Sequence, residues 1–203
     1  MTEQPMTQTT NFLLAGVGGQ GILLAADVIA LVGMEMGLDV KKSEVHGMAQ
    51  RGGSVTSHVR WGRRVYAPLI TPGEVDYFVA FERLEALRYA EQVRPSGVIL
   101  INDYRIVPIS VGSGNDIYPS QADEDAAYAG AVRRRIYAPA MQLAQELGDV
   151  RVNNVVMLGA LSAFLDTPEN IWLEVIRQRV PERFVALNQR AFAAGRAEMA
   201  AHL

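Results

Sequence analysis

The chain has 203 residues, of which 49% are apolar, enough for a domain with a substantial hydrophobic core. A formal net charge of −3 excludes the broad basic surface that binds nucleic acids and anionic membranes. The absence of cysteine excludes disulfides, a thiolate nucleophile and iron–sulfur clusters ligated by thiolates of this chain. The three histidines lie far apart in the sequence, so we expect no metal site.

The first ten residues are polar, with neither a basic segment nor an apolar run. They predict a disordered tail rather than a signal peptide, followed by one domain over residues 11–203. The longest apolar run covers residues 22–34, and Asp27 interrupts it. Because a membrane-spanning helix needs about 20 apolar residues, we expect a cytoplasmic protein that does not enter a membrane.

The first half of the chain alternates strands and helices. Short apolar runs bounded by glycine or charged residues predict strands, at 12–15, 38–42, 75–81 and 98–103. Apolar residues at helical spacing predict two helices, at 22–36 and 82–93. Residues 43–53 predict a loop, the alternating residues 54–61 a half-solvated strand, and residues 65–70 its return in an antiparallel hairpin.

The second half is richer in helices. Two short runs around a glycine turn predict short strands, at 105–110 and 115–120. Four later segments predict helices, at 137–148, 152–166, 167–180 and 181–199. Thr167 suits the N-cap of the third and Pro168 its first helical position. The whole pattern predicts a three-layer α/β/α Rossmann-like domain with a mostly parallel sheet, an added antiparallel hairpin and a helical C-terminal part.

The segment after the first strand carries the pattern G-x-G-x-x-G at Gly16, Gly18 and Gly21, with Gly19 as a fourth glycine. In such a turn the first glycine lets the chain leave the strand sharply, the second lets an anion approach the backbone, and the third lets the helix pack closely. We expect four N–H groups to face that anion at the positive end of the helix, those of Gly18, Gly19, Gln20 and Gly21. The alternative is that the glycines only permit a tight turn.

A dinucleotide site also needs an acid about 20 residues further on, at the end of the second strand, to bind the ribose hydroxyls. Glu44 lies 23 residues beyond Gly21, and it either binds a ribose or caps a loop N–H group. Lys41 and Lys42 precede it, and Arg51 follows. A cluster that is basic apart from Glu44 suits phosphate groups better than a ribose diol alone.

The loop at 43–53 places His46 before one glycine and Arg51 before two, Gly52 and Gly53. Because it follows the carboxyl end of the second strand, this loop should face the glycine turn across the crevice of the sheet. There Arg51 would add charge-assisted hydrogen bonds to a phosphate. His46 is a candidate proton carrier, with the alternative that it binds a backbone carbonyl.

Two motifs together, "GVGGQG" (16–21) and "SEVHGMAQRGGSVTSHVRWG" (43–62), closely resemble the gamma-type domain of the 2-oxoacid:acceptor oxidoreductases. Within that family the chain is most similar to the small (beta) subunit of the indolepyruvate type. The resemblance covers nearly the whole chain, is strongest over residues 12–62, and continues in "NNVVMLGAL" (153–161).

The resemblance implies an enzyme that decarboxylates a 2-oxoacid, an arylpyruvate such as indolepyruvate, on thiamine diphosphate. It releases an acyl-CoA and passes electrons through iron–sulfur clusters to ferredoxin or a similar acceptor. The resemblance also implies that a larger alpha subunit carries the thiamine diphosphate and the clusters. The absence here of cysteine and of a recognisable thiamine diphosphate motif agrees with that division. This chain would be one subunit, inactive alone, that contacts CoA phosphates; self-association is compatible with this role.

Two other classes remain open from the sequence. One is a self-sufficient Rossmann-type oxidoreductase that binds a nucleotide or a flavin, although no Tyr/Lys or His/Asp pair stands out as its acid–base machinery. The other is a non-catalytic scaffold that binds a nucleotide. Outside the two motifs, Asn153 and Asn154 are expected to cap a helix. Trp61 and Trp172 are expected to pack in the core or to anchor an interface.

Overall fold

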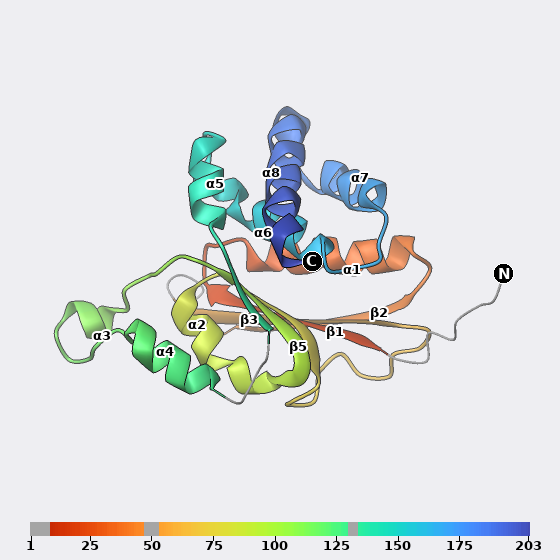
Figure 1. Ribbon diagram of the computed structural model, residues 1–203. Helices are drawn as coiled ribbons and strands as arrows, with labels where there is room; N and C mark the ends of the chain where they lie inside the picture. Colours follow the sequence, from red (N-terminus) through yellow and green to blue (C-terminus); the bar gives the residue numbers. More distant parts are fainter. Residues whose placement is uncertain (1–8, 47–52, 130–133) are drawn as a thin grey trace.

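The computed structural model describes residues 9–46, 53–129 and 134–203. Of His46 it describes the backbone but not the side chain. These residues form a six-stranded mixed sheet with α-helices on both faces (Figure 1). The three-layer α/β/α arrangement predicted from the sequence is therefore confirmed.

The strands follow one another across the sheet in the order β2-β3-β1-β4-β5-β6. Their bounds are β1 (Thr10–Val17), β2 (Asp39–His46), β3 (Ser54–Gly62), β4 (Val75–Ala80), β5 (Val93–Asn102) and β6 (Arg134–Ala138). β1, β4, β5 and β6 pair in parallel, whereas β3 runs antiparallel between β2 and β1. The carboxyl ends of all these strands except β3 therefore lie at one edge, where ligands bind in open α/β sheets.

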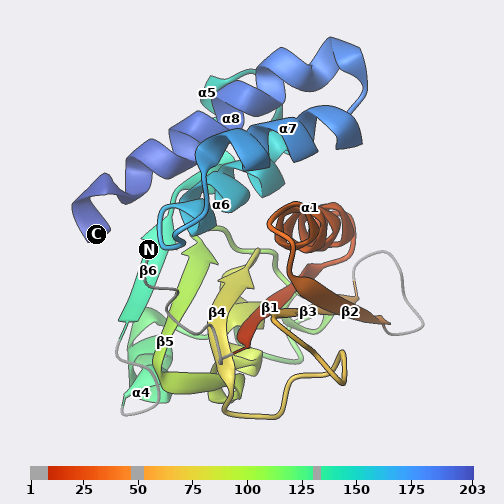
Figure 2. The ribbon, with the colours of Figure 1, turned by 90° about the vertical axis from the view of Figure 1, so that its right-hand side faces the viewer.

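One layer of helices covers each face of the sheet, and the first layer is the larger (Figures 1 and 2). The first layer contains α1 (Ile22–Glu35), α5 (Ala140–Glu146), α6 (Asn153–Ser162), α7 (Glu169–Arg179) and α8 (Val185–Glu198). The second contains α2 (Arg83–Arg88), shorter than the helix predicted at 82–93, and α4 (Gln121–Tyr128). Between β5 and α4, the single-turn helix α3 (Ile109–Gly112) projects from the body (Figure 1).

The alternation of side chains in β1 explains why both helical layers are needed. Phe12 and Leu14 are buried in the core shared with α1 and α6, whereas Leu13 and Ala15 are buried in the smaller core shared with α2 and α4. Because both faces are covered, the middle of β1 is apolar at every position, as predicted. Trp61 of β3 packs on Phe12, with ring centroids 4.5 Å apart, so its predicted packing role is confirmed.

α6 is buried on all sides because α8 crosses it in backbone contact. A Cβ atom at Gly159 of α6 would lie 2.0 Å from the carbonyl oxygen of Phe192, and one at Gly195 of α8 would lie 1.9 Å from that of Val156. Residues with side chains cannot take either place without separating the helices. Trp172 of α7 packs beside this crossing, 6.0 Å from the Phe192 ring, and is a core residue as expected.

An antiparallel hairpin is present, as predicted. β3 forms it with β2, and not with the predicted return strand at residues 65–70. Residues 65–70, all of them described, form no strand, and β3 pairs with β2 and β1 instead. β2 continues past its predicted end at Lys42 to His46, into the segment predicted as a loop. The reason is that β2 is an edge strand, which accommodates charged side chains that a central parallel strand would exclude.

In the second half, two predictions of secondary structure are wrong. The described stretch 105–120 contains α3 and irregular backbone where the sequence predicts strands at 105–110 and 115–120. β6 occupies 134–138, where the sequence predicts no strand and a helix from 137 onward. β6 is short and begins with two arginines, so its pattern resembles a solvated loop although it pairs with β5.

Two predicted boundaries are also wrong by a few residues. α7 begins at Glu169 with Pro168 at its N-cap, so the cap predicted at Thr167 is one residue too early. β1 begins at Thr10, inside the predicted tail, because that polar residue pairs with Trp61 of β3. Residues 1–8, the rest of that tail, lie outside the described residues.

The α6–α8 crossing makes a prediction about stability. Gly159→Ala should lower the free energy of unfolding by about 1–3 kcal/mol, because its methyl group overlaps the backbone of α8. For a chain of this size this corresponds to a drop in Tm of roughly 2–4 °C per kcal/mol, measurable by thermal denaturation. Gly112→Ala is the control, since a Cβ there meets no atom within 4 Å. Equal Tm values for the two variants would contradict the close crossing.

Candidate functional site

The glycine turn joins β1 to α1 at the carboxyl edge of the sheet, and its glycines meet different constraints. A Cβ at Gly16 would lie 2.8 Å from Cβ of Phe81. Gly21 is the N-cap of α1 with a φ of 77°, and a Cβ there would lie 2.4 Å from Nδ2 of Asn154. Gly19 has a φ of 106°, and no atom of the described residues lies within 4 Å of its Cβ position. Two glycines thus serve packing, and Gly19 leaves open backbone that a ligand can approach.

The side chain of Gln20 braces this turn against the sheet. Its Oε1 accepts a hydrogen bond from the N–H of Val17 at 2.7 Å, and its Nε2 donates to the carbonyl of Phe81 at 2.8 Å. Its own backbone N–H donates to the carbonyl of Val17 at 3.2 Å. Gln20 therefore holds the end of β1 beside the end of β4, a role that the glycine pattern alone does not reveal.

The structure brings Gly53, from the second motif, into contact with the turn. The N–H of Gly18 donates to the carbonyl of Gly53 at 2.9 Å, one residue beyond the last pair of β1 and β3. Gly18 and Gln20 thus use their N–H groups within the protein. Among the described residues, no acceptor is recorded for the N–H groups of Gly19 and Gly21. Those two groups are the ones that can face an anion.

The N-terminus of α1 adds a favourable field for an anion. Its N-cap, Gly21, provides no side-chain hydrogen bond, and its first turn contains no acidic residue. The positive end of this 14-residue helix is therefore not compensated by its own side chains. An anion at the turn would satisfy N–H groups that the helix itself leaves unpaired.

A buried acid holds the start of β3 on the opposite face of the sheet. Ser54 donates to Oε2 of Glu85 at 2.5 Å, and the hydroxyl of Tyr89 lies 3.1 Å from that of Ser54. Burial raises the pKa of Glu85, opposed by the hydrogen bond from Ser54 and the charge of Arg88. These contacts fix Ser54 and, with it, the neighbouring Gly53 beside the glycine turn.

Three predicted site groups lie outside the described residues: Arg51, Gly52 and the side chain of His46. The backbone of His46 pairs with Val55, so both flanks of this segment lie at the same edge of the sheet as the glycine turn.

The structure does not bring Glu44 to the turn. β3 separates β2 from β1, which places Glu44 about 10 Å to the side of β1. Glu44 pairs with Ser57 of β3, two residues further from the carboxyl edge of the sheet than the pair of His46 and Val55. Its carboxylate accepts a hydrogen bond from Nζ of Lys42 at 2.6 Å. Glu44 therefore balances a lysine charge and lies away from the glycine turn.

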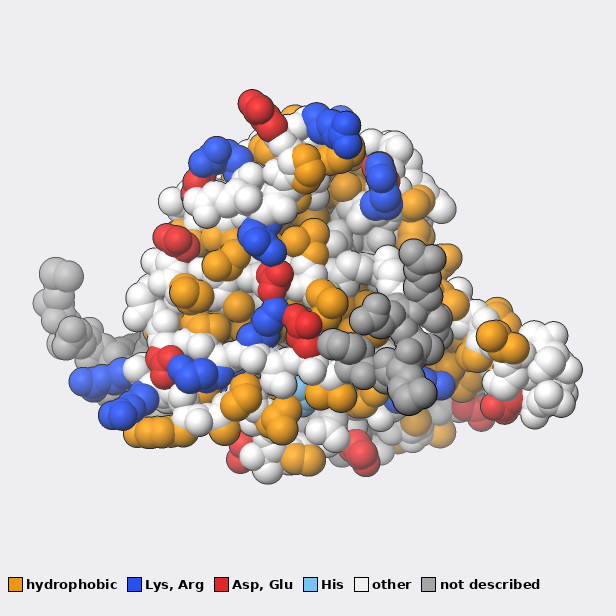
Figure 3. Space-filling view, turned by 180° about the vertical axis from the view of Figure 1, so that it is seen from behind, with side chains coloured by type: hydrophobic (Ala, Val, Ile, Leu, Met, Phe, Trp, Pro, Cys, Tyr) orange, Lys and Arg blue, Asp and Glu red, His pale blue; other side chains and the backbone are white. Residues whose placement is uncertain are grey.

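The two lysines of the second strand are neutralised by acids. Lys42 forms an ion pair with Asp27 of α1, and Lys41 with Asp39. Burial lowers the pKa of Lys42, but hydrogen bonds to Asp27 and Glu44 outweigh it, so the pKa is raised overall. Acidic and basic side chains accordingly alternate on this side of the molecule (Figure 3). The basic cluster that the sequence suggests is not a free positive surface.

Neither asparagine expected to cap α6 occupies its N-cap position, but Oδ1 of Asn154 accepts a hydrogen bond from the N–H of Val155 in the first turn at 2.9 Å. The N-cap of α6 is Val152, which makes no side-chain hydrogen bond. Asn153 donates to the carbonyl of Val150 at 2.7 Å. Nδ2 of Asn154 lies 3.4 Å from the carbonyl of Gly21, so this side chain closes the glycine turn from the side of α6. Asn154 is a site residue that the sequence analysis missed, because its partner lies 133 residues away.

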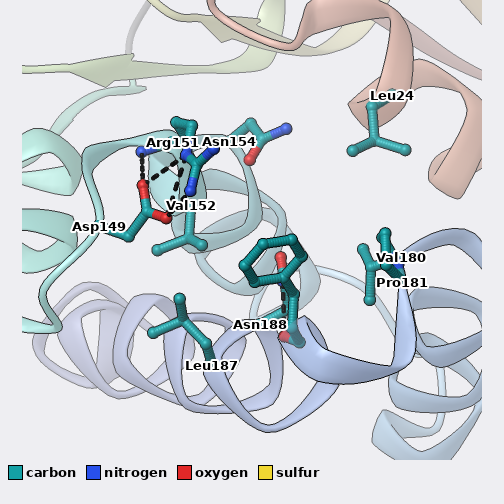
Figure 4. Close-up of a pocket in the computed structure, with 10 residues that line it drawn as sticks. Leu24, Asp149, Arg151, Val152, Asn154, Val180, Pro181, Leu187 and Asn188 are labelled. Atoms are coloured by element: carbon teal, nitrogen blue, oxygen red, sulfur yellow. Dashed lines mark hydrogen bonds and ion pairs between the residues drawn. The ribbon is translucent and has the colours of Figure 1, made fainter.

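A groove opens next to the turn, on the side of the helical layer (Figure 4). It has a volume of about 190 Å³ and a mostly apolar lining, with the ion pair between Asp149 and Arg151 at one end. The lining residues are Leu24, Asp149, Arg151, Val152, Asn154, Val180, Pro181, Phe184, Leu187 and Asn188. Because cofactor pockets usually enclose about 300–1,000 Å³, this groove could hold only part of a nucleotide cofactor.

Within the described ranges, no three His, Asp or Glu side chains gather in a way that could hold a metal ion. No helix in the same ranges is long and apolar enough to cross a membrane.

Known proteins resemble this chain over almost its whole length. A family model described as Pyruvate ferredoxin/flavodoxin oxidoreductase matches residues 11–198. Indolepyruvate oxidoreductase subunit IorB of Thermococcus kodakarensis is 38% identical over 188 residues, which are 91% of this chain and 93% of that protein. The subunit of the same name from Archaeoglobus fulgidus is 39% identical over 187 residues, 91% of this chain and 92% of that one.

A solved structure shows the same fold inside a longer chain. It is the 2-oxoglutarate:ferredoxin oxidoreductase from Magnetococcus marinus with 2-oxoglutarate, coenzyme A and succinyl-CoA bound. The match has a TM-score of 0.76 and 25% identity, and it covers 97% of this chain but 32% of that one. By sequence and by fold, the chain belongs to the pyruvate ferredoxin/flavodoxin oxidoreductase family, whose members include subunits of 2-oxoacid oxidoreductases.

Proposed function

We propose that this chain is the subunit without iron–sulfur clusters of an arylpyruvate, specifically indolepyruvate, oxidoreductase that acts in the cytoplasm. The observation that carries the proposal is the 38% identity to an indolepyruvate oxidoreductase subunit along 93% of that protein. The enzyme would oxidatively decarboxylate the 2-oxoacid to an acyl-CoA and reduce ferredoxin.

The chemistry of the residues supports a division of labour with a larger alpha subunit. Clusters need thiolate ligands, and this chain has no cysteine, so the clusters belong on the partner. Thiamine diphosphate, which stabilises the carbanion left by decarboxylation, would also be held there. Alternatives in which this chain alone is a flavin- or nucleotide-dependent enzyme, or a non-catalytic scaffold, are less well supported, because the relatives that it matches over more than nine tenths of their length are named as oxidoreductase subunits.

In this proposal the glycine turn contacts the phosphate groups of CoA. The N–H groups of Gly19 and Gly21 and the uncapped start of α1 supply donors and a positive field. Arg51, two residues before Gly53 in the sequence, would supply a charge-assisted hydrogen bond. The structurally similar Magnetococcus enzyme binds CoA. Because the groove beside the turn is too small to enclose CoA, the partner subunit would complete the site.

The role of Arg51 is tested in the assembled complex by titrating CoA calorimetrically. Arg51→Ala should weaken CoA binding by about ten-fold or more, because a hydrogen bond from a charged donor contributes about 1.5–3 kcal/mol. Arg64→Ala is the matched control, since Arg64 follows β3 at the opposite edge of the sheet. If both variants bind CoA as tightly as the wild type, Arg51 does not belong to the site.

The division between subunits is tested by expressing the chain with and without the candidate alpha subunit. Oxidation of arylpyruvate with CoA and a low-potential dye should require both chains, because neither the clusters nor thiamine diphosphate can be assigned to this one. Full activity of the purified chain alone would refute the proposal. A yellow colour or nicotinamide fluorescence in that preparation would favour a self-sufficient oxidoreductase.

A further inference from the structure

β2 is the longer of the two edge strands of the sheet, with eight residues, and no strand of the described residues pairs with its outer side. Figure 2 shows it at one end of the sheet, beyond β3. β6, at the other end, has five residues and begins with two arginines. A long edge strand with free backbone groups is a template for pairing with another strand, whereas a short one is protected.

The side chains of β2 alternate between the two faces of the sheet. Lys42 and Glu44 lie on the face covered by α1, with which Lys42 forms an ion pair. Lys41, Ser43 and Val45 lie on the opposite face, where Val45 is 53% exposed although it is apolar. A strand that pairs with this edge must therefore match a particular order of charges on one face and cover an apolar side chain on the other.

A second copy of β2 meets both requirements in one register. Two identical antiparallel strands in one sheet are related by a two-fold axis perpendicular to it, so residues opposite one another lie on the same face. With the axis at Ser43, Lys42 of each copy lies opposite Glu44 of the other. Because these two residues also contact each other within the strand, at 2.6 Å, the four charges alternate in sign. On the other face, the methylene chain of Lys41 covers Val45.

The other registers are unfavourable. An axis at Lys41 or at Lys42 places that lysine opposite its own copy, and an axis at Glu44 places two carboxylates together. Directly opposed like charges destabilise an antiparallel pair. Axes nearer the ends of β2 pair at most three residues of each copy, because the strand spans only Asp39–His46. The lysines, which discourage pairing at an edge in general, thus leave a single register open.

We infer that two copies of this chain associate edge to edge through β2, in an antiparallel pair centred on Ser43 that continues the sheet across both copies. The strand is its own complement in charge and in apolar cover, as a symmetric contact between identical subunits requires. A single pair of strands is a small interface, so the dimer should dissociate on dilution. This contact does not depend on the proposed function.

Cross-linking tests the register directly, because the chain has no cysteine of its own. Ser43→Cys places one thiol of each copy at the two-fold axis, where opposite Cα atoms lie about 4.5–5.5 Å apart, within reach of a disulfide. Mild oxidation of the purified chain should convert this variant to a covalent dimer on non-reducing gels. Ser113→Cys, an exposed position after α3, is the control and should cross-link far more slowly.

Equal rates of cross-linking at positions 43 and 113 would refute the contact. The link at position 43 should also form in the complex co-expressed with the alpha subunit. A link that forms only in the chain purified alone would assign this edge to the alpha subunit and overturn the inference. If no such complex forms but the link does, the proposed function fails and the contact stands.

Two substitutions of Val45 test the same register through charge. The side chain is 53% exposed, so Val45→Lys and Val45→Glu should both keep the Tm of the wild type. Val45→Lys places a lysine opposite Lys41 of the other copy and should raise the dimer dissociation constant about ten-fold or more, measured by sedimentation equilibrium. Val45→Glu should leave it equal or lower. An axis at Lys42 would instead bring position 45 opposite Asp39 and reverse this order. Either that reversal or a wild-type chain that sediments only as a monomer would contradict the inference.

Discussion

The close approach of four elements at the end of β1 is the constraint on which the rest of the molecule depends. β1, β4, α1 and α6 meet there with no room for a side chain at Gly16 or Gly21, and the amide of Gln20 bridges two of them. A Cβ at either glycine would push α1 away from the sheet or from Asn154. The close packing at Gly16 and Gly21 therefore sets both the position of α1 on the sheet and the direction of its N-terminus. The fold and the candidate phosphate site thus depend on the same contacts.

Local patterns in the sequence were enough to predict β1, α1, the glycine turn and the layered architecture, because strand length, helical periodicity and glycine spacing are local properties. The side-chain brace could not be predicted, since Gln20 bonds a carbonyl 61 residues away. The lysines were misleading for the same reason: Lys42 is neutralised by Asp27 of α1, which only the folded chain brings near. β6 was missed because its pairing with β5, not its composition, makes it a strand.

We propose above all that backbone N–H groups at the start of α1 bind a phosphate of CoA in the assembled enzyme. Hydrogen–deuterium exchange of the complex, measured with and without CoA, tests it most directly. Peptides covering residues 18–24 should exchange more slowly when CoA is present, while peptides from α8 should not change. Unchanged exchange over residues 18–24 in a complex shown to have CoA bound would contradict it.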